Sequence, residues 1–182
     1  MKKAIILLAF SVSINALSQS KVEITKDGII NTDQVIKLDS ISAKEIYTNI
    51  NKYIQKNYSN PSYVAKGSIE NEFISINGIK KNCVTEKVLL SNFYSDLEYY
   101  FNIDIKDSKI RITTSKLILN KKIDGSNYPT DLLNIKGSDY FKEDGSLRKQ
   151  PLKKKEEIEN AINTILIDIV SSIKDKKTKS DW

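Results

Sequence analysis

The sequence predicts a single α+β domain in which two helices, the second a long C-terminal one, pack on one face of an antiparallel β-sheet. The first observation is the strict alternation of apolar and polar residues along residues 97–106, the pattern of a strand with one buried face. The second is a pair of amphipathic helical stretches, residues 42–58 and 152–173. The third is the strand-like sequence between them, which leaves no room for the crossover helices of a parallel sheet.

The chain of 182 residues begins with the layout of a secretory signal peptide, so we expect an exported protein. Residues 1–18 combine early lysines, an apolar run over residues 4–14 and a small-x-small site, which predicts cleavage after Ser18. The run is shorter than the roughly 20 residues that span a bilayer, and an uncleaved anchor is the alternative. We expect a periplasmic or extracellular location and no transmembrane segment in the mature chain. Residues 19–34 predict a flexible lead or an edge strand.

Residues 35–173 are expected to form the domain, which begins with a short strand and the first helix. The apolar, β-branched segment Gln34–Asp39 predicts that strand. Ser42 is the expected N-cap of the helix, and Glu45, three positions later, completes a capping box. The Asn-Pro pair at residues 60–61 predicts the end of the helix, because the residue before proline avoids the helical conformation.

Strand-like segments follow the first helix. Residues 62–66 and 73–76 predict short strands, and the Asn-Gly pair at 77–78 predicts the turn that ends the second of them. Residues 97–119 predict a long hairpin with a tight turn at 107–108. In its first arm the odd-numbered residues are expected to be buried, and the even-numbered residues to face solvent.

The last third of the sequence combines an irregular stretch with a long helix. Residues 120–151 hold turn clusters and no periodic pattern, so they predict a long loop that is either functional or mobile. Residues 152–173 carry an apolar stripe and predict a helix roughly 33 Å long at 1.5 Å per residue. A ten-residue strand has about the same length, so we expect the helix to lie along the hairpin. Residues 174–182 predict a charged tail.

The residue inventory excludes several catalytic chemistries. The chain contains no histidine, which removes histidine bases, the Ser-His and Cys-His arrangements and the usual catalytic zinc sites. Cys83 is the only cysteine and so forms neither an intrachain disulfide nor a thiolate zinc cluster. The sequence has no glycine-rich phosphate loop and no run of oxygen ligands with calcium-loop spacing, so we expect no cofactor and no metal.

Two groups of residues are candidates for binding. Glu98, Tyr100 and Asp104 lie on the expected wet face of the hairpin, where an exposed tyrosine could stack on a sugar or a partner protein. Asp96 joins the two acidic residues in a second hypothesis, a hydrolase that uses paired carboxylates. The second group is basic and surrounds the start of the last helix: Arg148, Lys149, Lys153, Lys154 and Lys155. For both groups the alternative is an ordinary solvated surface.

Two short motifs carry a family resemblance. The sequence Val-Ile-Lys-Leu at 35–38 leads into the helix start at 42–47, and an acidic-apolar-Lys-Asp turn at 104–107 precedes the basic strand segment 109–112. With the expected signal peptide, these motifs resemble a family of secreted bacterial proteins of unknown function, described as having a TBP-like fold, over residues 35–173. The resemblance implies an exported α+β domain and transfers no catalytic residue. The fold name does not imply DNA binding, because a fold does not determine function.

We therefore expect an exported, non-enzymatic binding or scaffold module whose ligand the sequence does not identify. Its partner would be an envelope protein or a glycan rather than a nucleic acid, which an exported protein does not ordinarily meet. One alternative is a binder of anionic lipid or glycan that uses the basic residues 148–155, favoured by the net charge of +6. The other is the carboxylate hydrolase. The working surface is expected on the open sheet face or in the 120–151 loop.

Overall fold

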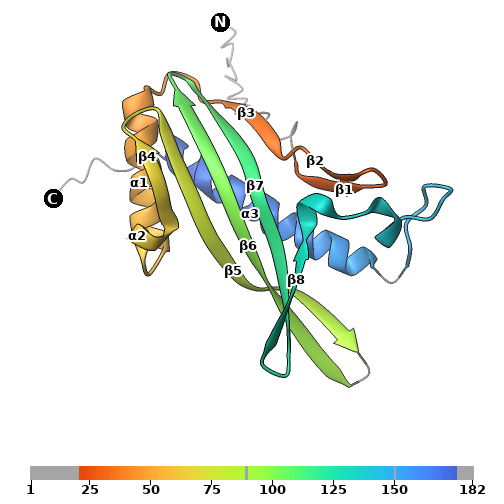
Figure 1. Ribbon diagram of the computed structural model, residues 1–182. Coiled ribbons are helices and arrows are strands. Elements are labelled where there is room, and N and C mark those ends of the chain that lie inside the picture. Colours follow the sequence, from red (N-terminus) through yellow and green to blue (C-terminus); the bar gives the residue numbers. More distant parts are fainter. Residues whose placement is uncertain (1–20, 89, 150, 176–182) are drawn as a thin grey trace, which may run out of the picture.

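The computed structural model describes residues 21–88, 90–149 and 151–175. The expected signal peptide and the tail beyond residue 175 lie outside the described residues. The strands, shown in Figure 1, are β1 (Glu23–Thr25), β2 (Gly28–Ile30), β3 (Asp33–Lys37), β4 (Ala65–Ile69), β5 (Phe73–Val88), β6 (Ser91–Lys106), β7 (Lys109–Ile123) and β8 (Ser126–Asp131). The helices are α1 (Ala43–Asn57), α2 (Pro61–Val64) and α3 (Leu152–Lys174), with two 3-10 turns, η1 (Leu132–Asn134) and η2 (Gly137–Asp139).

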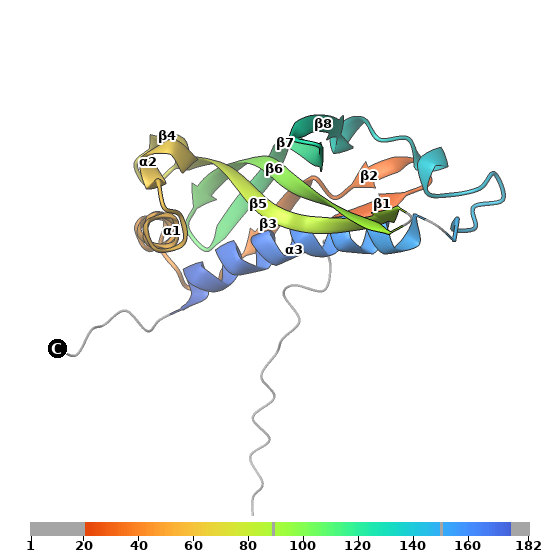
Figure 2. The ribbon, with the colours of Figure 1, turned by 90° about the horizontal axis from the view of Figure 1, so that it is seen from below.

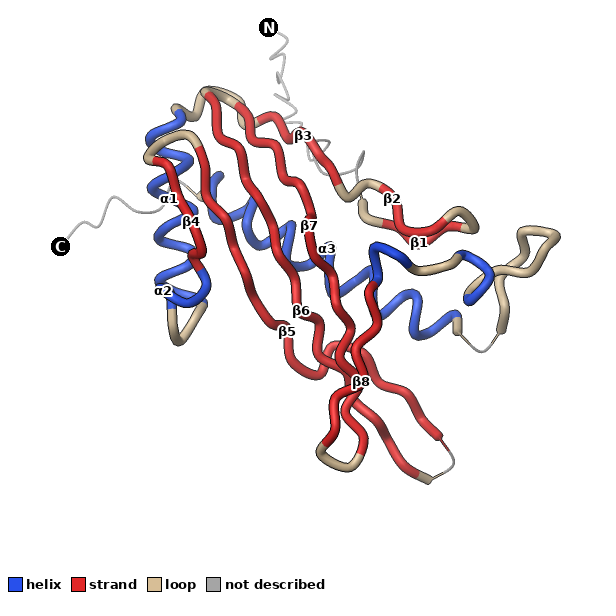
Figure 3. The backbone as a smooth tube through the Cα atoms, viewed as in Figure 1, coloured by secondary structure: helices blue, strands red, loops and turns tan. Residues whose placement is uncertain are grey.

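Six of the strands form one antiparallel sheet, which confirms the predicted fold class. The order is β3-β7-β6-β5-β4, and β8 is also paired with β7 (Figure 3). β3 pairs with residues 109–113 of β7 and β8 with residues 118–123, so the two short strands share one side of β7. β1 and β2 form a separate two-stranded hairpin.

The predicted hairpin of residues 97–119 is confirmed and forms the centre of the sheet. Lys106 lies opposite Lys109, with the turn at the two residues between them. Ser108 takes a φ of +60°, in the left-handed region that favours glycine. Along β6 the side chains from Leu97 to Ile105 alternate as predicted, with the odd-numbered ones buried.

The turn predicted at residues 77–78 is wrong, because both residues lie inside β5, a strand of 16 residues. Gly78 lies opposite Tyr99 of β6. The tyrosine ring covers the glycine so closely that a Cβ at Gly78 would lie 2.3 Å from the Tyr99 hydroxyl oxygen. That hydroxyl is hydrogen-bonded to the Tyr58 hydroxyl at 2.5 Å. The Asn-Gly pair therefore continues the strand, because the glycine leaves room for an aromatic side chain from the neighbouring strand.

The helix predicted after residue 42 is confirmed, and the strand predicted after it is only partly correct. Ser42 Oγ accepts the Glu45 backbone amide at 3.3 Å, the N-cap bond expected from the sequence. Residues 62–64, predicted as a strand, belong instead to α2, and β4 begins at Ala65. The physical reason is Pro61 at the start of this turn, where a missing amide is tolerated and Asn60 supplies the cap.

Residues 120–151 contain more regular structure than the long loop predicted for them. β7 continues to Ile123, turns through Asp124 and Gly125 with positive φ, and returns as β8. Every residue of β8 is exposed, so no apolar alternation marks this strand in the sequence. Further along, Arg148 Nε donates to the carbonyl oxygens of Ser138 and Phe141 at 3.0 and 3.2 Å, which closes the segment after η2.

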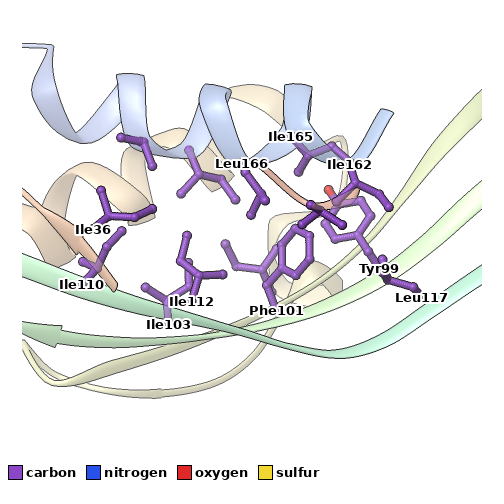
Figure 4. Packing of buried hydrophobic residues seen from close by; sticks show 14 of the residues in the cluster. Ile36, Tyr99, Phe101, Ile103, Ile110, Ile112, Leu117, Ile162, Ile165 and Leu166 are labelled. Carbon is purple, nitrogen blue, oxygen red and sulfur yellow. The ribbon is translucent and has the colours of Figure 1, made fainter. Parts of the chain in front are cut away.

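Both long helices lie on one face of the sheet, as predicted (Figure 2). Ile162, Ile165 and Leu166 of α3 face Phe101 and Ile103 of β6 across the core (Figure 4). The burial of these large apolar side chains makes the main favourable contribution to the free energy that holds the helices on the sheet. Among the described residues no helix is long and apolar enough to cross a membrane.

The β1–β2 hairpin packs against α3, so the described part of the N-terminal lead is strand and not flexible chain. Val22 exchanges two hydrogen bonds of 2.9 Å with the side-chain amide of Asn163. Ile24 N donates to Glu159 Oε1 at 2.6 Å. The side chains of Val22 and Ile24 are buried, which adds this hairpin to the core.

Ion pairs hold the first turns of α3 against the far end of the sheet. Glu86 of β5 lies 2.6 Å from Lys154 Nζ of α3 and 2.5 Å from Lys121 Nζ of β7. Glu157 Oε2 accepts the backbone amide of Thr85 at 2.8 Å. Burial opposes ionisation of Glu86, but the hydrogen bonds from the two lysines outweigh it and keep the pKa of this carboxyl below its usual value.

Replacing Gly78 by alanine is expected to destabilise the fold, because the new methyl group would collide with the Tyr99 ring. Overpacking of this kind costs roughly 1–3 kcal/mol in the free energy of unfolding, which urea titration measures. The matched control is Gly67→Ala in β4, where an added Cβ has no neighbour within 4 Å. Equal unfolding midpoints for the two variants would contradict the proposed contact.

Replacing Glu86 by glutamine is expected to destabilise the fold near neutral pH and to have little effect in acid. A carboxyl whose pKa is lowered by folding stabilises the fold above its unfolded-state pKa of about 4.3, and loses that contribution as pH falls through its folded-state pKa. We expect a loss of roughly 1–2 kcal/mol at pH 7 that shrinks below about pH 4. Urea unfolding of wild type, Glu86→Gln and the exposed control Glu143→Gln at several pH values tests this. A Glu86→Gln deficit that persists undiminished in acid would refute it.

Candidate functional site

Among the described residues, no helix packs on the face of the sheet opposite α1 and α3 (Figure 2). We name it the outward face and define it as the even-numbered residues 98–106 of β6, the residues paired with them on β5 and β7, and those paired in turn on β3 and β4. Residues directly opposite each other point to the same side, so these side chains form rows across the strands. The rows make this face a regular surface on which a partner could lie.

The structure places the three predicted hairpin residues on the outward face, as their alternation required. Glu98 forms an ion pair with Lys116 of β7 at 2.6 Å. Tyr100 is half-buried and also lies opposite Lys116. Asp104 is exposed and lies opposite Arg111. The three share one surface, and their role in binding stays a prediction.

Three lysines form one row across the end of the outward face. Lys109 of β7 lies opposite Lys37 of β3 on one side and Lys106 of β6 on the other. All three are exposed, and in the part of the chain that the structure describes none has a carboxylate within 4.0 Å. Like charges placed directly opposite each other destabilise a sheet. An anion bound across this lysine row would relieve that repulsion.

The outward face is hollowed beside the lysine row. Arg111 is held there by an ion pair with Asp33, with Nε and Oδ1 3.1 Å apart. The lining combines cationic, acidic and apolar groups, so the depression suits a ligand that carries separate charges next to an apolar part. Its volume is about 630 Å³, and its side-chain lining includes Val35, Glu72, Asp104, Lys106, Lys109 and Arg111.

Apolar side chains stand on the outward face as well. Val35, Ile69 and Ile79 expose 57%, 57% and 53% of their surface, and they come from three different strands. Single exposed apolar residues are ordinary on a protein surface. Here they flank a charged centre on an uncovered sheet, so the face offers both apolar area and charge to a partner.

The predicted basic group lies elsewhere, around the first turns of α3, and much of its charge is compensated within the molecule. Three of its lysines form ion pairs of 2.6 to 3.3 Å with Glu86, Glu157 or Glu159. Its arginine donates to backbone carbonyls, as described above. An external anion would therefore compete with existing partners for most of these residues: Arg148, Lys149, Lys153, Lys154 and Lys155.

Among the carboxylates considered for hydrolysis, Asp96 lacks the environment of a catalytic acid. Asp96 Oδ2 lies 2.7 Å from Lys122 Nζ, and Asp96 Oδ1 accepts the Asn82 amide at 2.8 Å. Burial opposes ionisation of Asp96, but these hydrogen bonds outweigh it and keep its pKa below the usual value. A general acid needs the opposite shift. Burial raises the pKa of the Cys83 thiol, and the described residues contain no group of three or more His, Cys, Asp or Glu that could hold a metal ion.

The sequence did not reveal the lysine row. Lys106 and Lys109 flank the predicted turn, and alternation alone would have placed both on the outward face. Lys37 joins them only through the pairing of β3 with β7, two strands far apart in the chain. No local pattern encodes that register, so the row could be found only in the structure.

Comparison with known proteins identifies the fold. A family model described as a domain of unknown function (DUF4468) with TBP-like fold matches residues 33–119, the part of the chain that contains the lysine row and the depression. Comparison with curated proteins gave no match. A crystal structure of a TBP-like protein from Parabacteroides distasonis ATCC 8503 has 15% identity and a TM-score of 0.56, and the alignment covers 79% of this chain and 91% of that one.

A second solved structure, a DUF4468 family protein from Bacteroides ovatus ATCC 8483, has 12% identity and a TM-score of 0.60. Its alignment covers 81% of this chain and 88% of that one. At such identities the similarity establishes the fold and nothing about ligands. The resemblance expected from the sequence is confirmed: residues 33–119 match the model of the DUF4468 family of unknown function, and the chain has the TBP-like fold of the two solved structures.

Proposed function

We propose that the protein is an exported, non-enzymatic binding module that holds an anionic partner of the cell envelope on its outward face. The observation that carries this proposal is the lysine row Lys37–Lys109–Lys106, whose charges repel one another and have no carboxylate partner among the described residues. Such an arrangement costs stability unless a ligand neutralises it. An acidic glycan or an acidic segment of an envelope protein has the required charge.

The surroundings of the lysine row support a partner that lies flat across the strands. The lining of the depression includes Lys106 and Lys109 of the row, and Arg111 and Asp104, which lie opposite each other, offer it charges of both signs. Val35 and Ile69 offer apolar contact at the two sides of the sheet. The platform is rigid, because the inward side chains of the same strands are buried, so little order would be lost on binding.

The two alternatives have less support. The basic residues 148–155 would have to release Glu86, Glu157 and Glu159 before they could bind an external anion at full strength. A carboxylate hydrolase would need an acidic group with a raised pKa, and the pKa of Asp96 is lowered.

The proposal predicts that removal of the lysine row weakens binding of an acidic polymer. We expect the triple variant Lys37→Gln, Lys106→Gln, Lys109→Gln to bind immobilised polygalacturonate or polyglutamate roughly tenfold more weakly than wild type, at low salt. The affinity of the wild type should fall as salt is added, because exposed charges are screened.

The matched control removes three exposed lysines from the other basic region, with the variant Lys142→Gln, Lys149→Gln, Lys153→Gln. Both triple variants lower the net charge equally, so a general effect of charge would weaken both alike. Loss of binding in the control but not in the lysine-row variant would transfer the site to the basic region around the start of α3. Wild-type binding that does not respond to salt would rule out an electrostatic site.

A further inference from the structure

The row of side chains next to the lysine row on the outward face has a different composition. It crosses β3, β7, β6, β5 and β4, and we name it the mixed row: Val35, Arg111, Asp104, Phe73 and Ile69. Each of the three lysines lies two residues from a member of the mixed row on the same strand, so the rows are about 7 Å apart. Residues of both rows line the depression of about 630 Å³. A ligand in the depression therefore meets two different sets of groups.

Asp104 places a free carboxylate beside the lysine row. Its side chain is exposed, and within the described ranges no Lys or Arg nitrogen lies within 4.0 Å of it. Arg111, directly opposite, is paired with Asp33 instead. A carboxylate at this position repels a ligand that is negatively charged throughout. The same carboxylate favours a ligand that puts an anion on the lysine row and a cation on the mixed row.

The apolar members of the mixed row suit the stem of a basic side chain. Phe73 is half-buried and lies opposite Asp104, on the same side of the sheet. Val35 and Ile69, at the two ends of the row, each expose 57% of their surface. Lysine and arginine pack their methylene groups on apolar surface while the charged end stays free to meet a carboxylate. The mixed row thus offers a basic side chain both kinds of contact.

The spacing of the two rows identifies the chemistry of the ligand. In an extended peptide the side chains of residues two positions apart point to the same side and are about 7 Å apart. An acidic and a basic residue with this spacing can therefore reach the lysine row and the mixed row together when the peptide lies along the strands. A polyuronate glycan satisfies the first row only, because all of its charged groups are anionic.

We propose that the outward face selects an extended peptide segment in which an acidic residue and a basic residue are two positions apart. The acidic side chain binds the lysine row, and the basic side chain binds Asp104 and packs on Phe73. This inference rests on the proposed binding of an anionic partner at the lysine row and adds the class of partner. Asp104 is the residue that sets the specificity, because it penalises a second negative charge at the mixed row.

Three dye-labelled peptides, titrated with the full chain at low salt and followed by fluorescence anisotropy, test the spacing and the charges. They are acetyl-Ser-Glu-Thr-Lys-Ser-amide, its isomer acetyl-Ser-Glu-Lys-Thr-Ser-amide, and the anionic acetyl-Ser-Glu-Thr-Glu-Ser-amide. We expect the wild type to bind the first about threefold more tightly than either of the others. The isomer has the same composition, but its two charges point to opposite sides of an extended chain.

The substitution Asp104→Asn is expected to change the affinities in opposite directions. Binding of the Glu-Thr-Lys peptide should weaken, because its lysine loses the carboxylate. Binding of the Glu-Thr-Glu peptide should tighten, because a repulsion is removed. A merely structural role of Asp104 would move both affinities the same way. The matched control is Asp139→Asn, an exposed residue of η2 outside the outward face, which changes the net charge equally.

The outcomes separate this inference from the proposed function. Tighter or equal binding of the Glu-Thr-Glu peptide by the wild type, with no effect of Asp104→Asn, would refute the inference and leave a site for purely anionic ligands such as an acidic glycan. Equal binding of the first peptide and its isomer would refute the extended arrangement. Failure of all three peptides to bind, or undiminished binding by the triple lysine-row variant, would overturn the inference together with the proposed function.

Discussion

Burial of one side of β6 against α3 is the constraint on which the rest of the structure depends. The side chains of Leu97 to Ile105 with odd numbers are buried, and they meet the apolar stripe of α3 in the core. A slip of one residue would turn this set to solvent, so the burial also fixes the register with β5 and β7. Because both long helices pack on this side, none of the described helices covers the opposite face of the sheet, and its side chains remain available for contacts.

The parts of the fold that could be predicted are those whose sequence pattern is set by local burial. In β6 and in the two long helices, buried and exposed side chains recur with a regular period along the chain. β5 could not be predicted at residues 77–78, because the strongest local turn signal is overridden by Tyr99 on the next strand. β8 could not be predicted either, because its side chains are all exposed and backbone pairing alone defines it.

The candidate site likewise contains residues whose position the sequence predicted and residues whose position only the structure reveals. Alternation alone placed Glu98, Tyr100 and Asp104 on one surface, whereas Lys37 reaches Lys109 only through a pairing between distant strands. For the basic residues 148–155 the sequence was misleading in the opposite direction. They were predicted as a group of cations free to bind an anion, but three of the lysines are paired within the molecule. Lys153 and Lys155 pair with Glu157 and Glu159 one turn later on the same helix, whereas Glu86, the partner of Lys154, lies far away in the chain and arrives there only when the sheet folds against α3. Charge that is clustered in a sequence therefore says little about charge that is available.

The distribution of charge on the outward face differs from the uniform pattern expected of a surface that binds a nucleic acid. A phosphate backbone carries a continuous line of negative charge and is matched by an uninterrupted stripe of Lys and Arg. On the outward face Asp33, Glu98 and Asp104 stand among the cations, and Arg111 and Lys116 are paired with acidic residues. Among the described residues, the lysine row is the cationic group of this face that lacks an ion pair, and it spans three strands at one end of the sheet. A ligand with a few anionic groups and some apolar surface matches this face better than a uniform polyphosphate does, although the fold is TBP-like.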